Sequence, residues 1–219
     1  MNKTMKKVLL ISLIVLVMTP LRANAFSWGD FFRALVGLST ATSVETLKED
    51  ISETYTEVKK DIVTADTKTE EAFLNISKTL SSEKDYAAIK SNLASAKAKT
   101  KDNERTDALN KLYSDYTTYL KNSKLEMILI MKTMTESEQN TLIKNINTLS
   151  EQGQRYYELN SKAKLATSRA GKKSYEDADL NSTIANTKAI EAQLENKAKT
   201  VSSLANQAKI LGALAGLKF

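Results

Sequence analysis

Oxygen-bearing side chains stand at alternating positions in one short stretch, as Asp177, Asp179, Asn181 and Thr183. This is the spacing of ligands 1, 3, 5 and 7 in a calcium-binding loop, where oxygen donors wrap a hard cation. The rest of that pattern is missing, because Ser182 replaces the glycine of position six and Lys188 replaces the glutamate of position twelve. We therefore expect an acidic helix N-terminus that complements the helix dipole, and no metal site.

Clustered carboxylates, such as Glu49 with Asp50 or Glu70 with Glu71, are the other groups that could act as a general acid and base. They alternate with lysines at three- and four-residue spacing, which is typical of the solvated face of a helix. The chain has no Cys and no His, which excludes thiol and imidazole catalysis, disulfides and Cys/His metal sites. No phosphate-binding glycine loop or nucleophile elbow is present. We expect no catalytic residue, no cofactor and no small-molecule substrate.

A row of tyrosines is the last feature of this kind. Tyr113, Tyr116 and Tyr119 are spaced by three residues, and Tyr156 and Tyr157 follow in the next apolar-patterned segment. Such rows usually pack at the edge of a core with their hydroxyls reaching water. A groove for a ligand or peptide is the alternative interpretation.

The elements that must carry these groups are long helices. From Val44 to Leu80 apolar or small residues recur with the helical period of about 3.6, which predicts one amphipathic helix roughly 57 Å long. Gly153 and Gly171 are the only glycines between residues 38 and 211, and that stretch has no Pro, so almost nothing interrupts a helix there. Gly153 falls on an apolar face, which indicates close helix approach.

Polar capping pairs divide the remaining chain. Ser82 with Asp85 opens a second segment, the capping box of Thr135 and Glu138 opens a third, and Ser174 with Asp177 opens the last, after a stop at Gly171. The polar stretch 97–107 is either a turn or an exposed helical overhang. The run 127–131 is apolar on all sides, as expected at the centre of a bundle. These features predict an all-α fold: an elongated antiparallel bundle of about four long helices with short amphipathic terminal segments.

Residues 1–25 have the three parts of a secretory signal peptide: an early basic stretch, an apolar run of eleven residues from Val8 to Met18, and the small-x-small site Ala23-Asn24-Ala25. Cleavage after Ala25 predicts a secreted or periplasmic protein. It also removes four basic residues and no acidic ones, leaving 28 basic and 26 acidic residues and a net charge of +2. Because these charges are interspersed, we expect no nucleic-acid partner.

The large aromatic side chains are concentrated at the two ends of the expected mature chain. Of the five Phe and one Trp, only Phe73 lies in the expected bundle. The pattern of residues 28–38 predicts a short helix whose apolar residues lie on one side. The segment from Ala208 to Phe219 is apolar on all sides, with a small residue at every fourth position. The residues expected to bind a partner or a membrane are Trp28, Phe31, Phe32, Leu35, Leu211, Gly212, Leu214, Gly216, Leu217 and Phe219.

The expected organisation is a signal peptide (1–25), a short amphipathic helix and linker (26–42), a long-helix bundle (43–207) and an apolar C-terminal tail (208–219). Three interpretations of the terminal segments stay open: a satellite core, a docking surface for a partner or for self-association, and insertion into lipid. The plan is similar to that of exported helical-bundle adhesins, pilus-associated assembly proteins and helical pore-formers, without a motif of any one family. We expect a non-enzymatic protein that acts through protein contacts; the alternative is a membrane-active toxin or pore-former.

Overall fold

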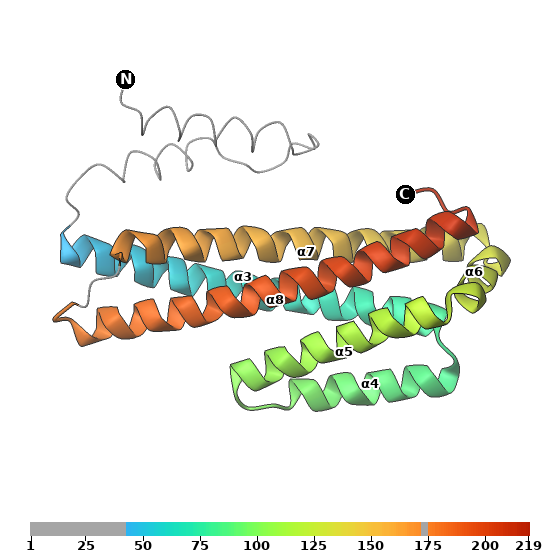
Figure 1. Ribbon diagram of the computed structural model, residues 1–219, viewed down its shortest axis with the longest axis horizontal. Helices are drawn as coiled ribbons and strands as arrows, with labels where there is room; N and C mark the ends of the chain where they lie inside the picture. The colour runs from blue at the N-terminus through green and yellow to red at the C-terminus, as the bar shows by residue number, and fades with distance from the viewer. Residues whose placement is uncertain (1–42, 172–174) are drawn as a thin grey trace, which may run out of the picture. The chain divides into compact units, whose positions relative to one another are not determined.

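The computed structural model describes residues 43–171 and 175–219, and all regular secondary structure in these ranges is helical, as predicted. Six helices follow one another (Figure 1): α3 (Val44–Leu80), α4 (Glu83–Lys97), α5 (Asp102–Asn122), α6 (Lys124–Thr133), α7 (Glu136–Ala170) and α8 (Ala178–Ala215).

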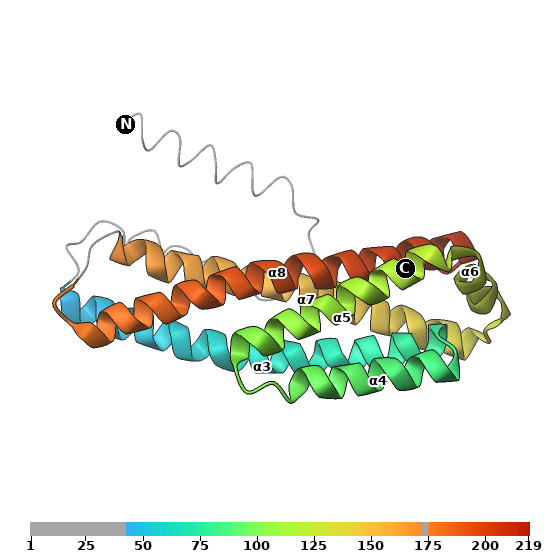
Figure 2. The same ribbon diagram turned by 60° about the horizontal axis from the view of Figure 1, so that its bottom comes forward.

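Three long helices form the body of this unit. Figures 1 and 2 show α3 and α8 running in the same direction, with α7 running antiparallel to both. The start of α3, the end of α7 and the start of α8 share a small core that contains Leu47, Ala166 and Leu180. The rest of their buried faces join one larger core, which includes Phe73, Ile146 and Leu194.

The prediction of about four long helices undercounts the segment between Ser82 and Met134, which forms three helices. Helix α4 ends at Lys97 and α5 begins at Asp102, so the polar stretch contains a turn. A second break at Ser123 separates α5 from α6, although neither Gly nor Pro marks it. The break lets α6 turn across the end of the core, where it buries Met127 and Met131. Placing this apolar run at the centre of the bundle was therefore wrong.

The predicted helix boundaries are mostly confirmed. The capping box is present, with the Thr135 N–H donating to Glu138 Oε2 (2.8 Å) and the Glu138 N–H donating to Thr135 Oγ1 (3.3 Å). Gly171 ends α7 with a φ of 65°, a conformation that costs glycine little. The N-cap of α8 is Asp177, whose carboxylate accepts from the Leu180 N–H (2.9 Å). The predicted cap, Ser174, lies outside the described residues, and because Asp177 is the cap, α8 begins at Ala178, later than predicted.

The tyrosine row lies deeper than expected. Tyr113 and Tyr116 are buried and their rings meet Phe73 edge to face, with centroid distances of 4.9 and 5.3 Å. Tyr119 is half-buried and stacks on Tyr116. Because α5 packs against α8 across this part of the core, the row fills the interior and does not line a groove.

Charged pairs match the antiparallel helices α3 and α7. Asp50 pairs with Arg169 (3.3 Å), Glu57 with Lys162, and Asp61 with Arg155 (2.6 Å). The acidic partner comes from α3 in each pair, so part of the predicted carboxylate face is engaged across helices. Exposed pairs of this kind add little stability, but their order favours one register of the two helices.

Candidate functional site: the apolar end of the bundle

One end of the bundle combines α6 with the last turns of α8. Figures 1 and 2 both place α6 and the close of α8 at the end where α3 finishes. Met127 and Met131 of α6 are fully buried in the same core as Leu211 of α8. The packing of α6 over this core therefore leaves its opposite face turned toward solvent.

That outer face of α6 carries large apolar side chains. Leu125 is 78% exposed and Leu129 is 64% exposed, and the two are one helical turn apart. On α8, Ile210 (54%) and Leu214 (49%) are also one turn apart and exposed, as is Phe219 beyond the helix. We call these five side chains the apolar end.

The chain folds back after α8 through a glycine. Gly216 has a φ of 96°; its N–H donates to the Ala213 carbonyl (3.1 Å), and the Leu217 N–H donates to the Gly212 carbonyl (2.9 Å). This is the hydrogen-bond pattern by which a left-handed residue closes a helix. It directs Leu217 into the core and lays the Phe219 ring against Gly212, so that a Cβ added at Gly212 would lie 2.7 Å from Phe219 Cζ. The space beside Gly212 is therefore filled by the chain's own tail.

The structure divides the predicted binding residues into three groups. Trp28, Phe31, Phe32 and Leu35 lie outside the described residues. Leu211, Gly212 and Leu217 are buried within the bundle, and Gly216 closes α8, whereas Leu214 and Phe219 are exposed. Helix α8 continues unbroken to Ala215, through most of the segment expected as a tail.

Three residues of the apolar end were missed by sequence reasoning: Leu125, Leu129 and Ile210. For Leu129 the signal was present in the all-round apolar character of 127–131, which a helix covered on one side does not need. It was misinterpreted because the break at Ser123 has no local sequence mark. Ile210 lies in the segment 208–219 that was expected to be apolar on all sides, but it was not among the expected binding residues.

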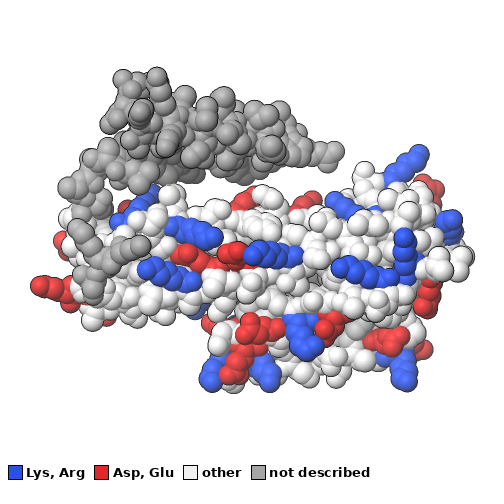
Figure 3. Space-filling view, in the orientation of Figure 1, with Lys and Arg blue, Asp and Glu red and all other residues white. Residues whose placement is uncertain are grey.

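Cationic side chains accompany the apolar end. Lys124 and Lys132 belong to α6, Lys209 lies near the end of α8 and Lys218 follows it, and Glu126 is the acidic residue of the stretches 124–133 and 209–219. The Lys209 ammonium lies 6.0 Å from the centroid of the Phe219 ring. On the face drawn in Figure 3, charges of both signs mix along the helices, and at this end blue cationic groups and a few red acidic ones lie beside uncharged surface.

A buried polar cluster at mid-bundle is the other concentration of functional groups. Lys197 of α8 is 6% exposed, and its Nζ donates to both carboxylate oxygens of Asp66 on α3 (2.7 Å each). The Tyr156 hydroxyl of α7 also donates to Asp66 (2.7 Å), and the Lys197 ammonium lies 5.6 Å from the Tyr156 ring centroid. Burial and the Asp66 charge raise the pKa of Tyr156. The three side chains hydrogen-bond or pair with one another, so we assign the cluster a structural role: it holds α3, α7 and α8 in register.

The alternating oxygens near residue 177 have partners of their own. Lys48 Nζ lies 2.8 Å from Asp177 and 3.5 Å from Asp179, and Asn181 hydrogen-bonds the backbone of Tyr175. The hydrogen bond from Lys48, with the cap to Leu180, lowers the pKa of Asp177. Within 43–171 and 175–219, no group of three or more acidic side chains is arranged to hold a metal ion.

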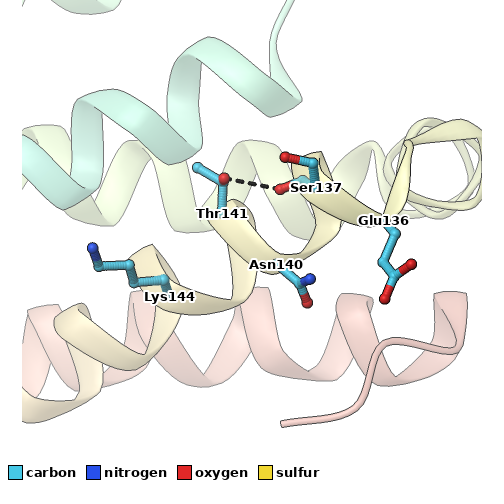
Figure 4. A pocket seen from close by; sticks show the side chains of 5 residues that line it. All are labelled: Glu136, Ser137, Asn140, Thr141 and Lys144. Atoms are coloured by element: carbon cyan, nitrogen blue, oxygen red, sulfur yellow. Dashed lines mark hydrogen bonds between the residues drawn. The ribbon is translucent and has the colours of Figure 1, made fainter.

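Two hollows on the surface lack an enclosing wall. Figure 4 shows the first, in which the five labelled side chains all project from the opening turns of α7 and the Thr141 hydroxyl donates to the Ser137 carbonyl (2.9 Å). Because one helix supplies every group, no second element brings a side chain opposite them. The second hollow lies over α8 and reaches Lys121, Tyr157 and Ile210.

Fold and surface together define an all-helical bundle protein with an exposed apolar end, and among the described helices none is long and apolar enough to span a bilayer. No protein-family model, no curated protein and no solved structure matches the chain.

Proposed function

We propose that this chain is an exported, non-enzymatic helical-bundle protein that acts through protein contacts at its apolar end. The single observation that carries the proposal is the concentration of exposed large apolar side chains on α6 and on the end of α8. Elsewhere in the described chain such side chains are spread out, as Val63 on α3 and Leu165 on α7. A clustered apolar surface rimmed by charges is typical of an interaction site.

The energy available at this surface is sufficient for docking. Covering one large apolar side chain gains roughly 1.5–3 kcal/mol when it was fully exposed, at about 25 cal/mol per Å². The five side chains of the apolar end are about half to three-quarters exposed, so a partner that covers them gains several kcal/mol before the cost of association. A surface of this size suits a role as an adhesin-like, assembly or secretion-associated component.

Export belongs to the same proposal. Cleavage after Ala25 and a secreted or periplasmic location rest on the sequence pattern of residues 1–25. N-terminal sequencing of the protein released by the producing cell tests it, and we expect Phe26 as the first residue.

Site-specific photo-crosslinking in the producing cell tests the contact surface. A photoreactive residue at Leu129 should give adducts of defined mass, and the same residue at Val63, which is 66% exposed on mid-α3, should give few. Adding Leu125→Asp should remove the Leu129 adducts because it places a charge within the contact. Equal labelling at Leu129 and Val63 would contradict the proposal.

The second candidate function is action on a membrane, and the observation that favours it is the cationic rim of the apolar end. Lysines beside exposed apolar side chains are typical of segments that lie on anionic lipid. Vesicles of anionic lipid, with neutral vesicles as the control, test it by co-sedimentation and leakage. Vesicle binding without protein adducts at Leu129 would replace the first proposal with this one.

A further inference from the structure

We infer that the apolar end of one copy of this chain is covered by segment 28–38 of a second copy, so that the protein assembles head to tail. The inference rests on the proposed function and names its partner. It connects the two apolar surfaces of the chain, one described by the structure and one predicted from the sequence.

The two surfaces are alike in kind. The apolar end presents Leu125 and Leu129 from α6 and Ile210 and Leu214 from α8, whereas Phe219 lies against Gly212, on the opposite side of α8 from Ile210. Segment 28–38 predicts a helix with Phe31, Phe32, Leu35, Val36 and Leu38 in one arc. An apolar helix face laid on an apolar surface is a standard mode of recognition.

The chain's length prevents the segment from covering the apolar end of its own copy. The segment is joined to α3 at Ser43, at the end of the bundle opposite α6 (Figures 1 and 2). Helix α3 has 37 residues and is therefore about 55 Å long. The five linker residues 39–43 extend to at most about 17 Å, and a helix of eleven residues adds about 16 Å. The sum falls well short of the far end.

Among the described residues within reach of the segment, exposed large apolar side chains do not form a comparable group. Val44 and Val63 are exposed on α3 but lie nineteen residues apart, about 28 Å along the helix axis. Leu165 is on α7. A second copy placed end to end brings its own apolar end next to Ser43 of the first, within the reach of a linker of this length.

The geometry of such a contact is heterologous. Each copy supplies one segment 28–38 and one apolar end, so every contact leaves one of each free at the two ends of the assembly. A contact of this type grows into a chain of copies or closes into a ring, and it does not stop at a two-fold symmetric dimer. This property separates it experimentally from pairing of two apolar ends with each other.

Two complementary variants of the chain from Phe26 test the inference by sedimentation. The first carries Phe31→Asp and Phe32→Asp and retains only the apolar end; the second carries Leu125→Asp and Leu129→Asp and retains only the segment. We expect the unmodified chain to form species larger than dimers, each variant alone to stay monomeric, and their equimolar mixture to give dimers only. Each pair of substitutions should weaken association by at least about tenfold, since central apolar anchors dominate such contacts.

Matched controls keep the test independent of folding. Val63→Asp, at a comparably exposed aliphatic position of mid-α3, should assemble like the unmodified chain. Thermal melting followed by circular dichroism should show all variants folded, because the substituted α6 side chains are mostly exposed. Leu214→Asp on α8 provides a second variant of the apolar end.

Two results would overturn the inference. If the Phe31→Asp/Phe32→Asp variant still self-associates, the contact joins apolar ends directly; if the unmodified chain stays monomeric, the occupant is not a second copy. In either case the proposed function stands when photo-crosslinks at Leu129 reach a protein, and it fails when they do not. Binding to anionic vesicles alone would overturn both in favour of the membrane function.

Discussion

The middle of this bundle buries polar side chains, whereas its end exposes apolar ones. At mid-bundle a buried lysine meets a partly buried carboxylate, and Asp66, Tyr156 and Lys197 satisfy one another across three helices. At the apolar end, Leu125 and Leu129 lie in water with nothing described over them. The first arrangement is complete within one chain, whereas we propose that a partner completes the second.

The contrast separates structure from function. A buried ion pair adds little net stability, because removing two charges from water offsets most of their attraction, but it does penalise misaligned helices. Asp66, Tyr156 and Lys197 come from α3, α7 and α8, so a shift of any one helix leaves a charge or hydroxyl buried without its partner. The apolar end has no such internal role, which is why we assign the contact surface there.

The largest expected effect comes from a charge in the apolar core. Leu194→Asp or Ile146→Asp replaces a side chain that is at most 1% exposed, and burying an unpaired carboxylate there should cost more than about 4 kcal/mol. We expect the bundle to lose its cooperative thermal transition in circular dichroism. A melting temperature equal to that of the parent would show that these faces are not buried.

The mid-bundle cluster should be the next most sensitive region. Asp66→Asn removes the countercharge of the buried Lys197 and should cost about 3 kcal/mol. The matched control is Asp61→Asn, which breaks the exposed pair with Arg155 and should cost less than about 1 kcal/mol. Denaturant unfolding measures both. A loss of similar size for the two variants would mean that the cluster does not hold the helices in register.

High pH should weaken the core through the buried tyrosines. Burial raises the pKa of Tyr116 to about 12, and it also raises the pKa of Tyr113. The folded state therefore holds these protons more tightly than the unfolded chain, whose tyrosines titrate near pH 10, so stability falls as pH rises above about 10. For Tyr116 alone the loss should reach about 2 kcal/mol near pH 11.5, at 1.36 kcal/mol per pKa unit.

Comparing Tyr116→Phe with the parent at pH 8 and near pH 11.5 isolates this effect from the titration of lysines. The variant should lose less stability than the parent between the two pH values, because Phe has no proton to release. An equal loss in both chains would place the Tyr116 hydroxyl in water.

Local sequence patterns predicted most helices and their ends, because period, caps and glycines act within a few residues. The capping box at Thr135 and the stop at Gly171 are examples. The break at Ser123 could not be predicted, since no Gly or Pro marks it and its cause is the packing of α6 on the far end of the core. The pairing of Asp66 with Lys197 could not be predicted either. These residues are 131 positions apart, and no local pattern determines how their two helices align.

Two glycines sharpen the same comparison, one at mid-bundle and one at the apolar end. A Cβ at Gly153 would lie 2.4 Å from the hydroxyl oxygen and 3.2 Å from the backbone nitrogen of Ser202. The hydroxyl can rotate away, but the backbone of α8 cannot without separating two long helices. Gly153→Ala should therefore cost about 1–2 kcal/mol in denaturant unfolding, as overpacking of a core does. A cost near zero would mean that α7 and α8 separate easily at this point.

The smallest effect on stability is expected for Gly212→Ala. The added Cβ would lie 2.7 Å from Cζ and 2.8 Å from Cε2 of Phe219, and both atoms are at the far end of an exposed ring that can rotate away. The gain in helix propensity from Gly to Ala, up to about 1 kcal/mol, opposes the lost contact, so the net change should stay within about 0.5 kcal/mol. Displacing the Phe219 ring should nevertheless change the shape of the apolar end and weaken self-association measured by sedimentation. If Gly212→Ala instead destabilises as much as Gly153→Ala, the folded-back tail is part of the core that holds the bundle together. The apolar end would then contribute to stability as mid-bundle does.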